Sequence, residues 1–328
     1  MPHSLINEQI RIATKADHAI KGETLQSLWS GYGEVVRYFL SGVNACAQSV
    51  VVKWVSPPSK AHHPRGWNTN RSHQRKLHSY DVEMYWYQHF AKQCGEYSRV
   101  PEVYGVYQYS VESHVHTVMV LEDLDAAGYQ LRKDQLELSE VKQCLRWLAN
   151  FHGRFMGQAP EGLWPVGSYW HLDTRPDEFE AMPAGELKDA AIDLDRRLRE
   201  SPFQTLVHGD AKVANFCFSE EGNVAAVDFQ YVGGGCGMKD VAYFLGSCMD
   251  EDDCEHYEKE CLDFYFAMLQ QSLVRQQSEI DFSQLEQEWR SLYPVAWTDF
   301  YRFLQGWMPG HSKINAYTLK LAEAVLSM

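Results

Sequence analysis

The stretch LVHGDAKVANFCF, residues 206–218, places a His, an Asp, a Lys and an Asn within HGDAKVAN, between hydrophobic residues typical of strands. Further along the chain, VAAVDFQ provides a second acid, Asp228, at the end of another hydrophobic segment. Two short strands of this kind present polar side chains from a rigid sheet to a cleft. The pattern therefore predicts a site built from Asp210, Asn215 and Asp228.

To catalyse phosphoryl transfer, a protein mainly has to position the reactants and neutralise the charge of the phosphates. A carboxylate such as Asp210 can orient and deprotonate an attacking hydroxyl. Mg²⁺ prefers oxygen ligands and keeps several waters, so Asn215 and Asp228 suffice to hold it when nucleotide phosphates supply further ligands. The residues thus favour a kinase that requires ATP and Mg²⁺.

HGDAKVAN followed by VDFQ resembles the catalytic and metal-binding loops of the aminoglycoside phosphotransferase and choline kinase superfamily. The sequence is most similar to its ecdysteroid-kinase-like branch, in which DFQ commonly replaces the DFG of protein kinases. The resemblance extends over about residues 29–305. It implies an α+β, two-lobed protein-kinase-like fold, with a β-rich N-lobe at 1–121, a connection at 122–128 and a mainly helical C-lobe at 129–328.

The resemblance also implies nucleotide-binding residues upstream. In VVVKWV, Lys53 would neutralise the α- and β-phosphates, and Glu83 on a following helix would fix its ammonium group, with Glu96 as a weaker competitor. Gly31 and Gly33 in SGYGEVV could form the turn over the phosphates, although GxG also closes plain hairpins.

The segment VMVLEDL resembles the lobe connection, and we expect the backbone of Glu122, Asp123 and Leu124, rather than the carboxylates, to bind adenine. We expect the side chain of Lys212 either to contact the γ-phosphate or to be solvated on the loop. We expect His208 to brace the catalytic loop, and Asp240 either to cap a helix or to brace the same loop.

His152 belongs to an amphipathic helix predicted at 138–156, where a structural role is expected. Strands are predicted at 34–40, 49–55, 101–106, 115–121, 205–207 and 224–229, and a helix at 80–93. The basic segment 56–80 is expected to be a loop, either mobile or folded over nucleotide phosphates; its irregular histidines do not favour a zinc site. The acidic run 249–260 fits the first turn of a helix better than a site for a cationic acceptor.

The composition bounds the remaining possibilities. The chain has 328 residues and a formal net charge of −14, which argues against a general nucleic-acid binder. Its eight cysteines form no CxxC pair, and no long apolar run is present, so we expect free thiols, no membrane partner and a cytoplasmic location.

The leading interpretation is an ATP- and Mg²⁺-dependent kinase that phosphorylates a hydroxyl of a small molecule, with Asp210 as the catalytic base. The alternatives are a nucleotide-binding regulatory protein without turnover, or a protein kinase; Gln230 in place of glycine and the lack of an APE-like anchor argue against the latter. The sequence leaves open the acceptor, the choice between ATP and GTP, and the oligomeric state.

Overall fold

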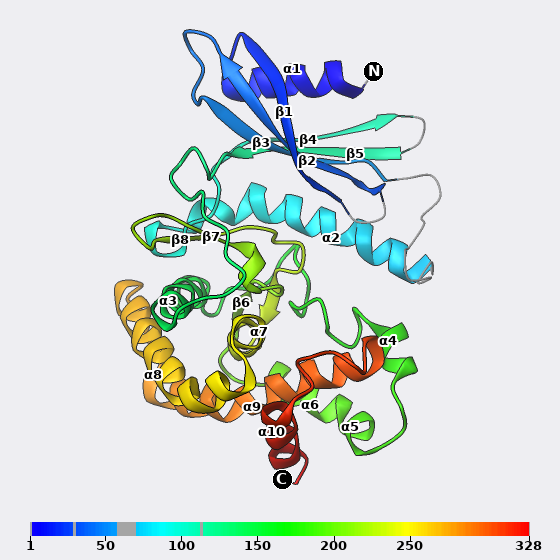
Figure 1. Ribbon diagram of the computed structural model, residues 1–328, viewed down its shortest axis with the longest axis vertical. Helices are drawn as coiled ribbons and strands as arrows, with labels where there is room; N and C mark the ends of the chain where they lie inside the picture. The colour runs from blue at the N-terminus through cyan, green and yellow to red at the C-terminus, as the bar shows by residue number, and fades with distance from the viewer. Residues whose placement is uncertain (1, 29–30, 58–69, 112–113, 328) are drawn as a thin grey trace. The chain divides into compact units, whose positions relative to one another are not determined.

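A computed structural model describes residues 2–28, 31–57, 70–111 and 114–327 of the chain. Contacts divide the chain into two compact units. The first comprises Met1–Gln93, Val100–Leu131 and Phe218–Glu220, and the second comprises Cys94–Arg99, Arg132–Cys217 and Glu221–Met328. The first unit is built on a sheet and the second mainly on helices, which confirms the predicted α+β class (Figure 1).

The first unit contains an antiparallel five-stranded sheet with the order β1-β2-β3-β5-β4. The strands are β1 (His18–Ser27), β2 (Gly33–Ser41), β3 (Ser49–Val55), β4 (Val103–Val111) and β5 (His114–Glu122). The strands predicted at 34–40, 49–55 and 115–121 are present, and the one predicted at 101–106 begins at Val103. The edge strand β1 was not predicted, because most of its residues are polar or exposed and give no alternating pattern.

Alternation along β3 gives its two faces different neighbours. Val50 and Val52 pack with Ile6 and Ile10 of α1 (Pro2–Thr14), a helix that sequence reasoning did not identify. Lys53 therefore points to the opposite face. Helix α2 (Asn70–His89) lies along that side of the sheet, whereas α1 lies along the other (Figure 1).

The start of α2 corrects the prediction of a loop over 56–80 and of a helix over 80–93. The helix begins at Asn70, and its first turns, NRSHQRK, contain no apolar residue that could reveal a helical period. It ends at His89, and a short 3-10 helix, η2 (Ala91–Gln93), follows. Lys60, His62, His63 and Arg65 of the basic segment lie outside the described residues.

The second unit combines short strands with many helices. Strand β6 (Thr205–Val207) pairs with β9 (Gly233–Gly235), and β7 (Phe216–Phe218) pairs with β8 (Val224–Ala226). Two 3-10 turns, η3 (Glu96–Ser98) and η4 (Val213–Asn215), accompany them. The helices are α3 (Leu138–Arg154), α4 (Pro176–Ala181), α5 (Glu186–Asp189), α6 (Ala191–Arg199), α7 (Met238–Cys248), α8 (Glu251–Arg275), α9 (Phe282–Trp307) and α10 (Ala316–Leu326).

Helix α3 matches the prediction at 138–156, and its apolar face, with Val141, Leu145 and Leu148, is buried. Each of the eight cysteines is a free thiol. Among the described residues, no helix combines the length and apolar character that crossing a membrane requires.

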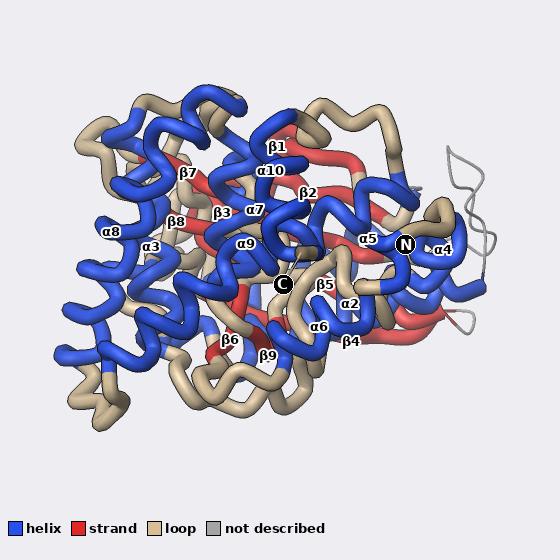
Figure 2. Tube along the Cα trace, turned by 90° about the horizontal axis from the view of Figure 1, so that it is seen from below, coloured by secondary structure: helices blue, strands red, loops and turns tan. Residues whose placement is uncertain are grey.

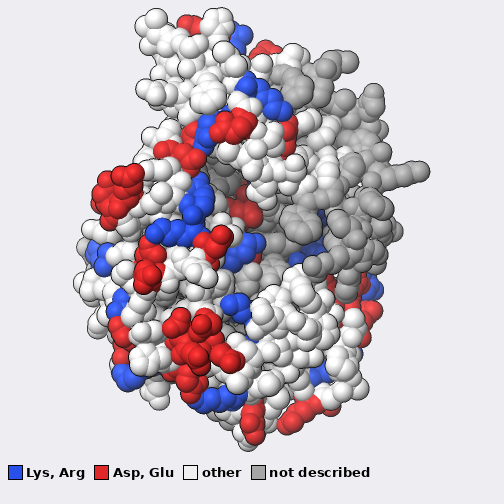
Figure 3. Space-filling view, viewed as in Figure 1, with Lys and Arg blue, Asp and Glu red and all other residues white. Residues whose placement is uncertain are grey.

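The acidic run 249–260 forms the start of α8. Asp250 caps the helix by accepting a hydrogen bond of 2.9 Å from the Asp253 N–H, and Glu251 and Asp252 occupy the first turn. These charges complement the positive end of the helix dipole, as expected from the sequence. Acidic and basic side chains are interspersed across the face shown in Figure 3.

Candidate active site

The loop that follows β6 is held by the carboxylate of Asp240. The N–H groups of His208 and Gly209 donate to its two oxygens at 2.5 Å and 2.9 Å. Helix α7 is capped at Gly237, so Asp240 braces the loop, one of the two roles expected for it. Burial raises the pKa of Asp240, but its hydrogen bonds and the nearby histidines outweigh burial and lower the pKa below the usual value.

Gly209 is required at its position by the backbone. Its φ is +78°, and a Cβ there would lie 2.0 Å from the carbonyl oxygen of Tyr231. The loop and the segment after Asp228 therefore approach each other more closely than a side chain at position 209 would permit.

The two predicted structural histidines connect this loop to its surroundings. His152, fully buried, lies 2.8 Å from the Tyr265 hydroxyl through Nδ1 and 3.1 Å from Asp240 through Nε2. His208 accepts from the Asp210 N–H at Nδ1, which leaves Nε2 to donate to the Val227 carbonyl at 3.0 Å. His208 thus links the backbone of Asp210 to the segment that precedes Asp228.

Asp210 is buried, and its Oδ2 accepts from Lys212 Nζ at 3.0 Å and from Asn215 Nδ2 at 3.2 Å. Burial raises its pKa; Lys212 opposes this effect, the charge of Asp228 adds to it, and the net shift is upward. A carboxylate with a raised pKa is a stronger proton acceptor than a solvated Asp. The site therefore favours a base at Asp210.

Asn215 and Asp228 fit a magnesium ion. The Asn215 amide nitrogen donates to the Asp210 carbonyl at 2.8 Å and to its carboxylate, so the amide oxygen is the atom left to act as a ligand. The Asn215 carbonyl in turn accepts from the Val227 N–H at 3.0 Å, which fixes the segment carrying Asp228 beside it. One carboxylate and one amide oxygen suit Mg²⁺ when phosphates complete its coordination.

Asp228 departs from the expected strand. Strand β8 ends at Ala226 rather than at Phe229, and Asp228 has a φ of +69°. Its Oδ1 accepts from Gln230 Nε2 at 2.6 Å. A non-glycine residue in this region is strained, and such strain is common where a side chain must point to a site.

Lys212 lies beside the site with its side chain about one third exposed. Burial lowers its pKa, but the carboxylate of Asp210 and the charge of Asp228 raise it by more, so the ammonium is stabilised. Its partner in the structure is Asp210, and its contact with a phosphate stays a prediction.

In the first unit, Lys53 and Glu83 form the predicted ion pair. Lys53 Nζ lies 2.9 Å and 2.6 Å from the two carboxylate oxygens of Glu83, and both side chains are buried. The competitor, Glu96, is exposed in η3 of the second unit. The role of the pair in binding phosphate stays a prediction.

Gly31 lies between β1 and β2, and Gly33 is the first residue of β2. The Leu28 N–H donates to the Gly33 carbonyl at 2.8 Å. A Cβ at Gly33 would lie 1.9 Å from the Trp54 carbonyl oxygen, whereas Gly31 has open space around it and a φ of +76°. The hairpin explains Gly33 without a nucleotide, and a phosphate contact stays a prediction for both.

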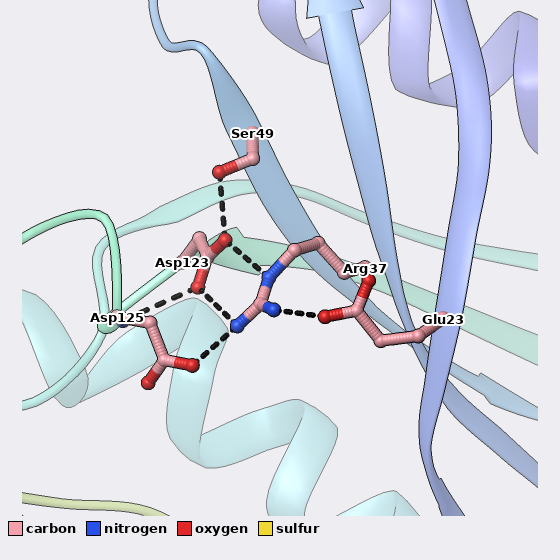
Figure 4. A network of polar contacts seen from close by, with 5 residues as sticks. All are labelled: Glu23, Arg37, Ser49, Asp123 and Asp125. Carbon is pink, nitrogen blue, oxygen red and sulfur yellow. Dashed lines mark hydrogen bonds and ion pairs between the residues drawn. The ribbon is translucent and has the colours of Figure 1, made fainter. Parts of the chain in front are cut away.

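The predicted lobe connection is anchored by Arg37, which sequence reasoning did not identify (Figure 4). Its guanidinium donates to Asp123 at 2.7 Å and 3.2 Å and also pairs with Asp125 and Glu23, and Ser49 donates to Asp123 at 2.6 Å. Burial lowers the pKa of Arg37, but the two aspartates raise it by more. The Asp123 carboxylate is therefore occupied internally.

The backbone of the same segment is also partly committed. The Glu122 N–H donates to the Glu102 carbonyl, and the carbonyls of Asp123 and Leu124 accept from Ala127 and Tyr129. Adenine recognition by the backbone of Glu122, Asp123 and Leu124 stays a prediction.

Two aromatic residues near Asp210 were also missed. Tyr169 and Tyr243 pack edge to face with ring centroids 5.4 Å apart. The Tyr169 N–H donates to the carbonyl of Gly209, next to Asp210, at 3.1 Å. Burial, followed by the charge of Asp210, raises the pKa of both hydroxyls. Neither belongs to a motif, and only the fold brings them to Asp210.

Comparison with protein families identifies the chain. The model of the ecdysteroid kinase-like family matches residues 60–156 and 177–278. The chain belongs to the ecdysteroid kinase-like family. Membership confirms the resemblance inferred from HGDAKVAN and VDFQ. A search of curated proteins returns no match.

Solved structures of small-molecule kinases share the fold of this family member. A choline kinase from Cryptosporidium parvum is 11% identical with a TM-score of 0.55, and the alignment covers 99% of this chain and 94% of that one. A putative aminoglycoside phosphotransferase from Ralstonia eutropha is 14% identical with a TM-score of 0.54, and the alignment covers 99% of this chain and 95% of that one. An amicoumacin kinase in complex with AMP-PNP, Ca²⁺ and Ami is 15% identical with a TM-score of 0.52, and the alignment covers 100% of this chain and 92% of that one. The predicted protein-kinase-like fold is thereby confirmed.

Proposed function

We propose that this protein transfers the γ-phosphoryl group of ATP to a hydroxyl of a small molecule, with Asp210 as the catalytic base. The observation that carries the proposal is the arrangement around Asp210. A buried carboxylate with a raised pKa is fixed through its backbone by His208 and through its side chain by Lys212 and Asn215. Family membership supports the same reaction.

Each residue has a separate role in this reaction. Asp210 accepts the proton of the acceptor hydroxyl as its oxygen attacks phosphorus, and Lys212 stabilises negative charge beside it. Lys53, fixed by Glu83 in the first unit, neutralises phosphate oxygens of the nucleotide. Asn215 and Asp228 hold Mg²⁺, which when bound offsets the charge of the phosphates.

The nucleotide is inferred from two independent observations. Lys53 and Glu83 form a buried ion pair of the kind that kinases use to fix a phosphate-binding lysine. A relative by fold, the amicoumacin kinase, is described in complex with the ATP analogue AMP-PNP. We therefore propose ATP as the phosphoryl donor.

The acceptor is proposed to be a small molecule with an apolar part. Tyr169 and Tyr243 lie near Asp210, and Tyr169 also packs against Tyr231 and Phe303. Aromatic side chains provide large contact areas for the carbon skeleton of an alcohol.

The test is a screen for turnover with ATP and MgCl₂ against amino alcohols, aminoglycosides, sugars and sterol alcohols. ADP release and the mass of the product are measured for the wild type and for Asp210→Asn. An acceptor that gains one phosphoryl group with the wild type, and not with the variant, is the expected result.

The controls separate the possible causes of failure. Asp193→Asn changes an exposed Asp on α6 and should leave turnover intact. Tight ATP binding without turnover for any acceptor would favour the regulatory alternative, and phosphate incorporation into proteins alone would favour a protein kinase. Either result would overturn the proposal.

A further inference from the structure

A pocket lies in the second unit, and none of the predicted site residues lines it. It has a volume of about 200 Å³ and is formed by α6, by β6 and β9, and by the segment at 158–166. Helix α6 and strands β6 and β9 lie close together in Figure 2. Much of its wall is apolar and is provided by Pro160, Pro165, Val166 and Leu198.

The unusual feature of this pocket is Lys239, which contributes to its wall from the first turn of α7. The residue is only 2% exposed, yet its ammonium forms no hydrogen bond or ion pair with any residue that the structure describes. The ring of Trp170 lies 5.9 Å from Nζ and offers a weak cation–π contact. Lys239 is therefore a buried cation without a direct polar partner in the described chain.

The neighbouring carboxylates contact other side chains. Asp299 accepts from Arg302 Nε at 2.8 Å. Asp195, which lines the pocket, lies 2.9 Å from His171 and 3.4 Å from Arg199. Both act on Lys239 only at longer range, together with Arg302 and Cys236, and burial dominates so that the pKa of Lys239 is lowered.

An anion bound in the pocket would supply the missing partner. We propose that this pocket binds a small aliphatic monocarboxylate, whose carboxylate pairs with Lys239 and whose short chain packs on the prolines, Val166 and Leu198. The pairing would offset the cost of keeping the ammonium away from water.

The pocket discriminates among anions by its size and by Asp195. A phosphate or a dicarboxylate would bring a second negative charge close to Asp195 without a second buried cation to balance it. Arg199 is about half exposed and already contacts Asp195, so it adds little. A single charge on a short apolar chain matches the wall best.

The test uses butyrate as the probe, with butanamide and butylamine as neutral and cationic analogues of similar shape. Binding to the full-length protein is measured by calorimetry and by the shift in Tm, at constant ionic strength. We expect saturable binding of butyrate, a raised Tm, and no comparable effect of the two analogues.

Variants locate the site. Lys239→Met keeps the length of the side chain and should weaken butyrate binding about tenfold or more, the size of effect expected for losing a hydrogen bond to a charged group. Val166→Trp should block the pocket and have the same effect while retaining Lys239. Lys212→Met removes the lysine beside Asp210 and should leave butyrate binding unchanged.

Two results would overturn the proposal. One is butyrate binding of equal strength to the wild type and to folded Lys239→Met, or its loss in Lys212→Met instead. The other is the absence of saturable binding to the wild type at about 50 mM butyrate, above the millimolar range expected for a ligand of this size. The proposal does not depend on kinase activity, so it can fail or succeed separately.

Discussion

At the scale of single residues, the ionised carboxylate of Asp210 lowers the stability of the folded protein. Its pKa is raised by burial and by Asp228, so the ionised form is less favourable in the folded protein than in the unfolded chain. This cost grows as the pH rises from the ordinary pKa of an Asp to the raised pKa, and it is complete above the raised pKa. The raised pKa that makes Asp210 a stronger base therefore also lowers the stability of the folded protein.

Asp210→Asn should strongly reduce turnover without lowering stability. At pH 7.5 we expect a Tm equal to or above that of the wild type, because the amide carries no charge to bury. The difference should shrink as the pH falls toward about 4, the ordinary pKa of an Asp, because protonation then removes the buried charge of the wild type. Thermal unfolding from pH 4 to 8 measures it, and a clearly lower Tm at pH 7.5 would contradict this account.

Lys212 should control the pH dependence of the base. Its ammonium lies 3.0 Å from Asp210 Oδ2 and favours the carboxylate form. Lys212→Met should therefore move the acid limb of the kcat/KM profile to higher pH, whereas Lys212→Arg should leave it near that of the wild type. An unchanged limb in Lys212→Met would mean that the limb does not report Asp210.

At the scale of elements, the close approach of the loop after β6 to Tyr231 depends on Gly209. Gly209→Ala would place a Cβ against the Tyr231 carbonyl at a positive φ, and we expect a loss of about 3 kcal/mol or more in unfolding free energy. Gly222→Ala is the matched control. Gly222 has a φ of +82° but open space, so only about 1 kcal/mol should be lost.

Arg37 plays a similar structural role in the first unit. Arg37→Met leaves the buried carboxylate of Asp123 without its cation, and a cost of about 3 kcal/mol is expected. Denaturant unfolding of the full chain measures it. Arg196→Met, which removes an exposed Arg on α6, is the control and should change little; equal effects of the two variants would argue against this role for Arg37.

The elements also show what sequence patterns can predict. Strand β3 was predicted with correct limits because SVVVKWV is rich in β-branched residues. The first turns of α2 are polar, and β1 is exposed, so neither has the periodicity on which prediction depends. At the site, motif spacing identified Asp210, Asn215 and Asp228, whereas Arg37, Tyr169 and Tyr243 acquire their roles only through contacts between distant parts of the chain.

At the scale of the whole molecule, family membership and the geometry around Asp210 point to the same chemistry. The family model matches segments in both compact units. The Lys53–Glu83 pair belongs to the first unit and the Asp210 loop to the second. The proposed reaction therefore requires functional residues from both.

The most direct test separates nucleotide binding from chemistry in Asp210→Asn. With an acceptor identified by the screen, the Kd for ATP in the presence of Mg²⁺ and the kcat are measured for the variant and the wild type. We predict a Kd within about threefold of the wild type and a kcat lower by about 10²- to 10⁴-fold, the contribution typical of a general base. A kcat close to that of the wild type would contradict the assignment of Asp210 as the catalytic base.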